Sequence, residues 1–465
     1  MLFFSRKNCP YFLFFCYICT TVDLIGCKLL TQNYKIKSKK MTSTQRKQGF
    51  LPSKWEVTAL IWVAYFLNQA DRQVFNVVLP QIRDGLGLTD SDMGLIATAF
   101  NLFYAVLVPL GGIIGDRYSR KWILTLCILF WSVATMFTGW ATGLISLIIL
   151  RSVATGGGEA LFGPNYNALL SEYHSDTRST AMSIVQTAYY IGVIASGFLA
   201  GKIADIWGWE YAFIVFGAVG IVHAIIMMIR LKDKRDIKAE REAKGKSNLL
   251  RDLIDGFTVI FRTPTAAVVT IGFAGLIFVL TGYLTWMPTY LQEAPFNMTS
   301  AEAGWHSMFY THFAAFFGVL IAGKLSDFVG AKGKPAWRTA MQGLGLIVAA
   351  PCIYYMGHSA STAIVFGALA IFGFARAFFD ANTYVVLYDV IPTKFHSSAS
   401  GVMIMIGFGT GALAPYILGL IKEASGLSLG FTILATIWLV CGLIMIVGGK
   451  VFYKKDILKL QQNEK

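Results

Sequence analysis

Six charged residues lie within long apolar stretches of the chain, where charged side chains are rare. They are Asp71, Arg72, Arg151, Glu159, Arg376 and Asp380. A charged side chain in an apolar medium costs on the order of 2.5 to 3.5 kcal/mol. Each of the six therefore has to be paired with an opposite charge or face water, and each is a candidate functional residue.

The spacing of these charges places them on helix faces. Arg151 and Glu159 are eight residues apart, close to two helical turns, so we expect them to share one face. Arg376 and Asp380 stand at i and i+4, again on one face. For this second pair two interpretations carry equal weight: a gate between states, or a local staple in which the two charges neutralise each other.

Asp71 and Glu159 have the chemistry of proton carriers. A carboxylate that pairs with an arginine in one conformation and faces water in another binds its proton with a different affinity in each. Such a difference is what couples proton movement to a conformational cycle. We therefore predict proton coupling through Asp71 and Glu159.

The arginines predict an anionic ligand. Arg72, Arg151 and Arg376 each present a planar fork of donors that matches a carboxylate. Amide and phenol side chains near the charges add hydrogen-bonding groups suited to a hydroxylated ligand. They are Asn68, Gln73, Asn165 and Tyr384. Together these residues predict a binding site for a monocarboxylate or sugar acid, such as a hexuronate, an aldonate or a sialate.

These residues are positioned by apolar segments of membrane-spanning length. Of the 465 residues, 55% are apolar and 14% are charged, whereas soluble proteins carry about 25% charged residues. Segments of roughly 20 apolar residues are long enough to cross a bilayer as helices. We expect them at 57–80, 93–115, 122–142, 144–171, 180–203, 211–231, 266–291, 303–326, 338–356, 361–390, 396–421 and 429–452. The sequence thus predicts an all-α integral membrane protein with twelve transmembrane helices.

One long polar stretch divides the twelve segments into two sets of six. We predict an N-terminal half over 41–229, a basic linker over 230–262, a C-terminal half over 263–455 and a tail over 456–465. Basic residues gather on the linker side of the membrane, which predicts that the linker and both termini are cytoplasmic. The formal net charge of +14 is thereby explained as a signal of orientation, and we expect no nucleic-acid partner.

The first 40 residues differ from the rest of the chain. They hold four of the seven cysteines, and we expect them to be a non-native or disordered extension that precedes a start at Met41. A signal-like segment is the alternative. The other cysteines, Cys127, Cys352 and Cys441, are too scattered for a metal site or a disulfide framework. We expect neither a metal nor another cofactor.

The two halves repeat in sequence. Residues 112–116, GIIGD, close the second segment, and residues 323–327, GKLSD, close the eighth. A six-plus-six repeat is typical of transporters whose site lies between the halves near the bilayer midplane. Charged residues in the two repeat loops, together with the acid of the tenth segment, are predicted to gate the site. They are Asp116, Arg117, Arg120, Lys121, Asp327 and Asp380.

The repeat loop resembles a known family. Residues 112–121, GIIGDRYSRK, are similar to the loop between spans two and three of the major facilitator superfamily. Ser119 stands where that family usually has glycine, and in the second copy Phe328 replaces the basic residue after Asp327. The resemblance implies the major facilitator fold, with these charged loops latching the helices on the cytoplasmic face.

Three further segments resemble particular families within that superfamily. LNQADRQVFNVVLP and RSVATGGGEALFGPNYNALLSEYHSDTRSTAMSI are similar to anion:cation symporters and, nearly as closely, to the spinster family, whereas TGYLTWMPTYLQEAPFNMTSAEAG resembles the organic-anion symporters more. The resemblance implies that Asp71, Arg72 and Glu159 act in proton coupling and substrate binding. It also implies that Arg151 binds the anion.

The predicted function is proton-coupled symport of a small organic anion across the plasma membrane, as in a bacterial inner membrane, by a monomer that alternates access. Two alternatives stay open: a spinster-like carrier of lipids, lysolipids or sugars, and a membrane nutrient sensor that binds its ligand without moving it. Sodium in place of protons also stays open. Because the sequence has no nucleotide-binding glycine loop, metal-ligand cluster or nucleophile elbow, we do not expect an enzyme.

Overall fold

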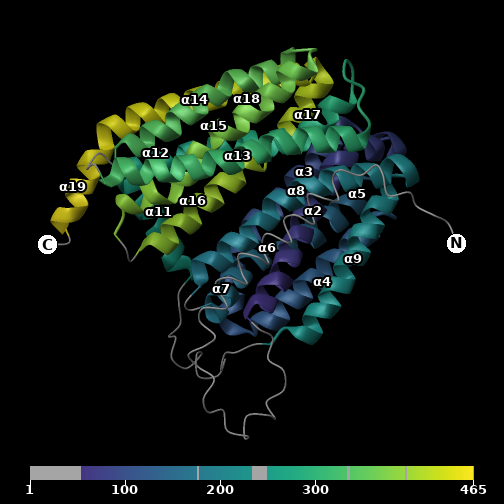
Figure 1. Ribbon diagram of the computed structural model, residues 1–465, viewed down its shortest axis with the longest axis horizontal. Helices are drawn as coiled ribbons and strands as arrows, with labels where there is room; N and C mark the ends of the chain where they lie inside the picture. The colour runs from purple at the N-terminus through teal and green to yellow at the C-terminus, as the bar shows by residue number, and fades with distance from the viewer. Residues whose placement is uncertain (1–53, 175–176, 233–248, 332–335, 393–394, 464–465) are drawn as a thin grey trace, which may run out of the picture. The chain divides into compact units, whose positions relative to one another are not determined.

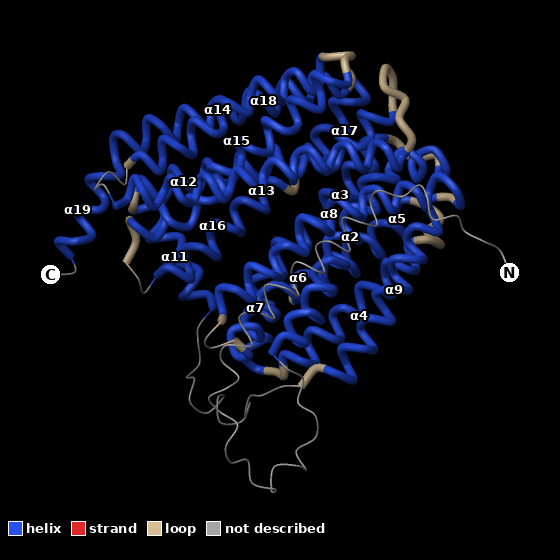
Figure 2. Tube along the Cα trace, in the orientation of Figure 1, coloured by secondary structure: helices blue, strands red, loops and turns tan. Residues whose placement is uncertain are grey.

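The regular elements of the described residues are all helices. The computed structural model describes residues 54–174, 177–232, 249–331, 336–392 and 395–463. The predicted extension over 1–40 and the middle of the predicted linker lie outside these residues. Figure 2 shows that short loops join most of the helices, as expected for segments that cross a bilayer back and forth.

The N-terminal half consists of six helical spans. Five of them are α2 (Lys54–Leu86), α3 (Asp90–Arg117), α4 (Arg120–Thr138), α8 (Arg178–Trp207) and α9 (Trp209–Arg230). The remaining span, fourth in chain order, is composite. It runs through α5 (Leu144–Leu147), η2 (Ile148–Thr155), α6 (Gly156–Ala160) and α7 (Phe162–Tyr173). The η2 segment is a π-helix, the form in which hydrogen bonds run from i to i+5 and which often occurs at functional sites.

The C-terminal half repeats this plan. Its spans are α12 (Pro264–Gln292), α13 (Ser300–Ala331), α14 (Trp337–His358), α15 (Thr362–Asp389), the pair α16 (His396–Gly411) and α17 (Ala414–Ser425), and α18 (Leu427–Gly448). The span of α16 and α17 is interrupted just before Pro415, which lacks the amide proton that a continuous helix requires. The π-helix η4 (Gly449–Tyr453) and the tail helix α19 (Lys454–Asn463) follow.

The predicted twelve-helix fold is confirmed. Eleven helical segments of the described chain are long and apolar enough to cross a membrane. The remaining predicted span is α2, which has 33 residues, or about 50 Å of helix. Its central polar residues, from Asn68 to Gln73, lower its hydropathy. The helix with the low hydropathy, α2, is therefore the helix that carries Asp71 and Arg72.

The end of the predicted linker is helical. Residues Leu249–Arg262 form α11, which packs against α16. A Cβ built on Gly256 would lie 2.7 Å from the carbonyl oxygen of Ser398, so a glycine at this point allows the two helices to touch. Only the middle of the predicted linker, 233–248, lies outside the described residues.

The two halves meet along helices that stand at different places in the chain order of their halves. In Figure 1, α13 of the second half lies beside α8 of the first, and their contact is extensive. A Cβ built on Gly197 of α8 would lie 2.6 Å from the carbonyl oxygen of Gly304 on α13. Small residues at such crossings let helix backbones approach closely in a membrane. α17 packs against α3 in the same way.

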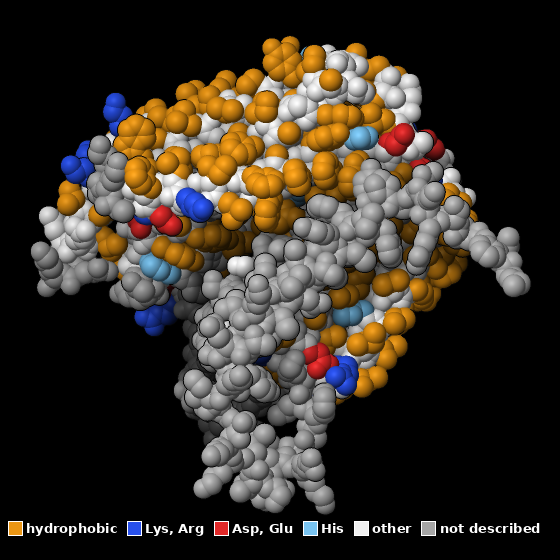
Figure 3. Space-filling view, viewed as in Figure 1, with side chains coloured by type: hydrophobic (Ala, Val, Ile, Leu, Met, Phe, Trp, Pro, Cys, Tyr) orange, Lys and Arg blue, Asp and Glu red, His pale blue; other side chains and the backbone are white. Residues whose placement is uncertain are grey.

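Large apolar side chains cover the outward face of the helices. Figure 3 shows them spread over the helices of the C-terminal half, with charged side chains gathered near the ends. Val348, Tyr355, Ile371 and Val447 are among the exposed ones. A soluble protein rarely exposes apolar patches of this extent, so this surface is suited to lipid.

Candidate functional site

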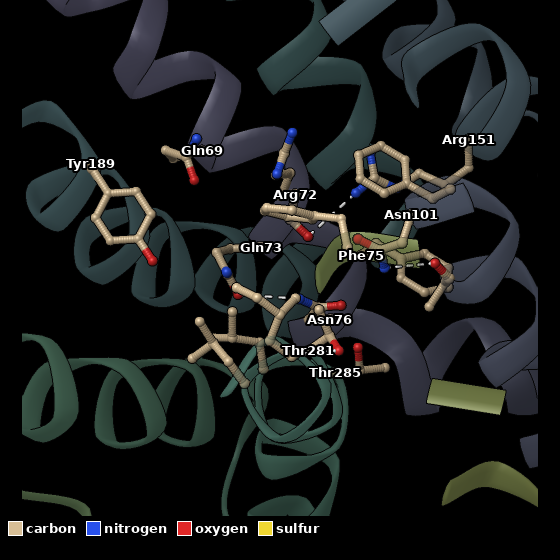
Figure 4. A pocket seen from close by; sticks show the side chains of 16 residues that line it. Gln69, Arg72, Gln73, Phe75, Asn76, Asn101, Arg151, Tyr189, Thr281 and Thr285 are labelled. Carbon is tan, nitrogen blue, oxygen red and sulfur yellow. Dashed lines mark hydrogen bonds between the residues drawn. The ribbon is translucent and has the colours of Figure 1, made fainter. Parts of the chain in front are cut away.

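A cavity of about 160 Å³ lies between the two halves and adjoins the first pair of intramembrane charges. Residues of α2, α3, η2 and α8 line it from the first half, and residues of α12 and α16 line it from the second. They are Gln69, Arg72, Gln73, Phe75, Asn76, Ala97, Phe100, Asn101, Arg151, Tyr189, Ile277, Leu280, Thr281, Leu284, Thr285 and Phe408. In Figure 4, Arg151 lies at one end, Tyr189 at the other, and the α2 side chains between them.

Arg72 and Glu159 form an ion pair beside this cavity. Arg72 Nε donates to Glu159 Oε2 at 2.7 Å. The Glu159 side chain is fully buried, whereas that of Arg72 is 21% exposed and lines the cavity. The pair therefore offers one cationic surface to a ligand and keeps the balancing carboxylate behind it.

Asp71 lies in a more enclosed environment than its neighbour. Its side chain is buried, and Thr135 Oγ1 of α4 donates to its Oδ2 at 3.3 Å. The other carboxylate oxygen has no hydrogen-bond partner. A buried carboxylate with so few hydrogen bonds is costly in its charged form.

Arg151 is buried with few polar partners. Its Nη2 donates to the backbone carbonyl of Arg72 at 3.3 Å, whereas its Nε and Nη1 have no partner. Figure 4 shows this guanidinium beside aromatic rings at the edge of the cavity. Because buried donors are normally hydrogen-bonded, these two point to a ligand with acceptor oxygens.

The π-helix brings Arg151 and Glu159 to the same neighbour. In a regular α-helix, eight residues turn through about 800°, which is about 80° beyond two full turns. A π-turn holds one more residue, so eight residues that include it complete about two turns. Both side chains thus face Arg72, as the shared face predicted from their spacing requires, and the π-helix is what achieves it.

The predicted amide residues fall into two groups. Gln73 lines the cavity and accepts from Asn76 Nδ2 at 3.3 Å, while Asn68 accepts from Gln69, which also lines the cavity. Asn165, in contrast, donates to the carbonyl oxygens of Gly111 and Leu161 and does not line the cavity. Its amide group is therefore used to tie the fourth span to α3.

Arg376 and Asp380 form their predicted i, i+4 pair in the other half. Arg376 Nη2 lies 3.5 Å from Asp380 Oδ2, and Arg376 is buried while the acid is partly exposed. Neither residue lines the cavity, and neither does Tyr384, which is 41% exposed. The structure thus separates the predicted site residues into a cluster at the cavity and a pair in the other half, of which Arg376 interacts with the cavity residue Tyr189.

The comparisons with known proteins agree with this architecture. Residues 61–415 match the family model described as Major Facilitator Superfamily. The chain belongs to this superfamily. It is 26% identical over 399 residues to the hexuronate transporter of Bacillus subtilis strain 168. The alignment covers 83% of this chain and 92% of that protein.

Two further similarities extend the comparison of this major facilitator. The D-galactonate transporter of Escherichia coli O6:H1 is 26% identical over 413 residues, covering 84% of this chain and 94% of that protein. A solved bacterial homologue of the human lysosomal transporter spinster has a TM-score of 0.75 at 22% identity, covering 88% of this chain and 99% of that one. The structural similarity establishes the fold.

The predicted gating residues of this major facilitator are only partly described. The side chains of Asp116 and Arg117 lie outside the described part of the chain. Arg120 forms an ion pair with Glu172, which joins α4 to the fourth span within one half. Lys121 lies 5.2 Å from the Trp122 ring centroid, and Asp327 is exposed.

A cluster of four charges, which no pattern in the sequence indicates, joins the two halves. It comprises Arg83 at the end of α2, Asp90 at the start of α3, Glu293 after α12 and Lys422 near the end of α17. Lys422 Nζ lies 2.7 Å from both Asp90 Oδ1 and Glu293 Oε1, and Arg83 Nη1 lies 2.8 and 3.2 Å from the same two atoms. We call these residues the interhalf quartet.

Other hydrogen bonds strengthen the closure at this end. Asp205 of α8 accepts from the backbone amides of Ser300 and Ala301 at the start of α13. Glu423 accepts from the backbone amide of Ser91 at 2.7 Å. The end of the bundle opposite the linker is therefore closed across the halves. In the sequence, each of these charged residues is only a polar residue at the end of a span. No sequence pattern indicates that they pair across the two halves.

Proposed function

We propose that this major facilitator is a proton-coupled symporter of a small organic anion of the sugar-acid class. The observation that carries the proposal is the Arg72–Glu159 ion pair at the wall of the cavity, next to Arg151 with its two unpartnered donors. A site of this kind holds cations whose availability to an anion depends on the charge of a neighbouring acid.

Protonation of Glu159 is the step that prepares the site. While Glu159 is ionised, it neutralises Arg72 at 2.7 Å. When it takes a proton, the guanidinium loses this partner and its donors become available to a carboxylate. The substrate anion then replaces the side-chain anion, so the proton and the substrate are bound together.

Asp71 provides a second site for a proton. Its buried, weakly hydrogen-bonded carboxyl group is stabilised as a charge only while positive charge is near. In the proposed cycle it is protonated together with Glu159 before the substrate binds. Both protons leave when the cavity opens to the cytoplasm, and the arginines then pair again with the acids.

The size of the cavity supports a small substrate. Its volume of about 160 Å³ is below the roughly 300 to 1,000 Å³ of pockets that hold drug-sized ligands. Its cations, Arg72 and Arg151, both lie on the N-terminal half, while α12 contributes Ile277, Leu280 and Leu284. One charged wall and one largely apolar wall fit a monocarboxylate whose ring or chain has a C–H face.

Two sugar-acid transporters among the relatives support the same class. Their names concern hexuronate and D-galactonate, each a six-carbon monocarboxylate with several hydroxyl groups. Gln69, Gln73, Asn76 and Asn101 provide amide groups for such hydroxyls around the cavity. We infer that this chain binds a molecule of the same chemical class.

Alternating access is the proposed means of transport. In the conformation observed, the interhalf quartet closes one end of the bundle. Because the basic linker and both termini are expected on the cytoplasmic side, the closed end faces outward and this conformation is inward-facing. Rocking of the halves would break the quartet and open the site to the outside.

Uptake into proteoliposomes tests the proposal directly. Purified protein should accumulate a radiolabelled sugar acid when the outside is acidic, and a protonophore should abolish the accumulation. Arg151→Met should remove binding, while Arg262→Met, at an exposed residue of α11, should leave it unchanged. Full anion affinity in Arg151→Met would refute the assignment.

A spinster-like carrier of lysolipids is the second candidate, favoured by the TM-score of 0.75 to the spinster homologue. The cavity volume is small for a lipid with its acyl chain. Counterflow separates the two candidates, because preloaded lysolipid should not drive uptake of labelled lysolipid if the substrate is a sugar acid. A protein that binds a sugar acid but shows no counterflow would instead be a sensor.

A further inference from the structure

Two arginines of like charge share one aromatic ring in the proposed site. The Arg72 guanidinium carbon lies 5.3 Å from the Phe100 ring centroid, and that of Arg151 lies 4.7 Å from the same centroid. Both distances are within the roughly 6 Å over which a ring face attracts a cation. Phe100 is buried on α3 and lines the cavity.

Each of these arginines also contacts a second aromatic ring. Arg72 also lies 4.3 Å from the Tyr104 centroid, and Arg151 lies 5.6 Å from the Phe75 centroid. The Phe100 and Tyr104 rings are nearly parallel, with centroids 6.5 Å apart. Phe100 is the ring of this set that both guanidinium groups approach.

Aromatic faces matter here because Arg151 has so little other stabilisation. A buried guanidinium has five N–H donors, and Arg151 uses one of its nitrogens on a carbonyl while Nε and Nη1 have no partner. Two cations close together in a medium of low dielectric also repel each other strongly. The negative ring face offsets part of both costs without neutralising the cations, as a carboxylate would.

The glycine run of the fourth span fixes the place of this ring. A Cβ built on Gly156 would lie 3.1 Å from the Phe100 carbonyl oxygen and 3.2 Å from its Cδ2 atom. A side chain at this position would therefore require Phe100 or the helix backbone to shift by a few tenths of an ångström. Gly156 directly follows η2, so the segment that positions Arg151 also makes room for the ring beneath it.

We propose that Phe100 is a positioning residue that holds the Arg72 and Arg151 guanidinium groups together as one carboxylate-binding site. This inference rests on the proposed function for the identity of the ligand. The ring attracts both cations without using the Arg151 donors Nε and Nη1, which have no partner. An aliphatic side chain of similar size would fill the space but provide no attraction for either cation.

A fluorination series separates this role from simple packing. Phenylalanine with one, two and three ring fluorines at position 100 keeps the shape and progressively weakens the attraction of the ring face for cations. We expect the affinity for D-galacturonate, measured by isothermal calorimetry on the full-length protein, to fall with each fluorine. Phe100→Leu should weaken it about tenfold, or about 1.4 kcal/mol, and Phe100→Tyr should retain it.

Phe162 provides the matched control. Its ring is equally buried in the N-terminal half and packs edge-on against Trp131 with centroids 5.3 Å apart. The same fluorines at position 162 should leave anion affinity unchanged. Equal effects at the two positions, or no trend at position 100, would overturn the proposal.

A substrate-free measurement keeps the inference distinct from the proposed function. Thermal unfolding of wild type, Phe100→Leu, Arg151→Met and the double variant forms a double-mutant cycle. We expect Phe100→Leu to lower Tm clearly in the wild-type background and less in Arg151→Met. Coupling without binding of any sugar acid would refute only the proposed function, whereas equal Tm shifts in the two backgrounds would refute the role of Phe100.

Discussion

Lys422 of α17 and Asp90 of α3 form an ion pair between the two halves, with Nζ 2.7 Å from Oδ1. The Lys422 side chain is only 8% exposed, so loss of its partner would leave a charge in a poorly solvated place. Glu293 contacts the same ammonium group at 2.7 Å. The end of the bundle opposite the linker is thus closed by charges that have to be hydrated when it opens.

Removal of Lys422 should shift the protein toward the outward-open state. In Lys422→Met the two acids Asp90 and Glu293 keep only Arg83, and their mutual repulsion favours separation of the halves. We expect a shift of about 1 to 3 kcal/mol, between the values typical of exposed and of buried ion pairs. It is measured as faster labelling of a cysteine at the cavity residue Thr285 by an impermeant maleimide added from outside.

A charge-balanced variant provides the control for that experiment. Lys422→Met combined with Glu293→Gln removes one charge of each sign and should label more slowly than the single variant. Asp84→Asn, at an acid that contacts Arg83 but is 70% exposed, should behave as wild type. Equal labelling of all variants would show that the interhalf quartet does not hold the outer end closed.

Glu159→Gln should uncouple substrate movement from the proton gradient. The amide keeps the size of the side chain but remains neutral, so Arg72 is permanently available to the anion. We expect the variant to exchange labelled for unlabelled substrate at a rate close to wild type. Concentrative uptake driven by an acid outside should fall at least tenfold, because the proton site is lost.

The pH dependence of binding gives an independent check on Glu159. In wild type, anion binding should strengthen as the pH falls, because protonation of the acid frees Arg72. In Glu159→Gln this dependence should be much weaker, with Asp71 left as the second acid. Concentrative uptake by the variant, or an unchanged pH profile of binding, would contradict the coupling role.

The fold could be predicted from the sequence because lipid imposes simple rules. Apolar segments of spanning length and the repeat between residues 112–116 and 323–327 are visible without a structure. Arg72 and Glu159 could be singled out because charges are costly in lipid, and the resemblance to symporters indicated their roles. Their contact, between residues 87 positions apart, became visible only in the structure.

Other parts of the site had no sequence signal. Arg83 and Glu293 are 210 residues apart, and charges at span ends are common in membrane proteins. Asn165 was chosen because it is polar and near Glu159 in sequence, yet its amide bonds two backbone carbonyls. The π-helix depends on the packing of the fourth span against α3 and α4, which no local residue pattern reveals.

Substrate selectivity should follow the distribution of charge around the cavity. Arg72 and Arg151 provide the cations of the cavity wall, and both belong to the N-terminal half. A second carboxylate turned toward the wall that the C-terminal half provides would face Leu280, Leu284 and Phe408, and no cation lines the cavity on that wall. We therefore expect D-galacturonate to compete at least tenfold better than the dicarboxylate galactarate in uptake assays, and equal competition would contradict this orientation.

Deletion of one residue from η2 should leave Arg151 and Glu159 on one helix face. Val153 is 40% exposed, so its loss removes little packing. Without the extra residue the segment should revert to a regular α-helix, in which the seven residues that then separate Arg151 from Glu159 turn through about 700°, within about 20° of two full turns. We expect the deletion variant to remain folded in detergent and to bind the anion with an affinity close to that of wild type.

Val153→Leu is the control for this deletion, because it keeps both the length of the segment and its lipid-facing character. It should bind the anion as wild type does. Circular dichroism and size-exclusion chromatography establish that the deletion variant is folded. If the folded deletion variant loses anion binding, a shared helix face is not enough to place Arg151 and Glu159 against Arg72, and the π-helix itself has a further part in the site.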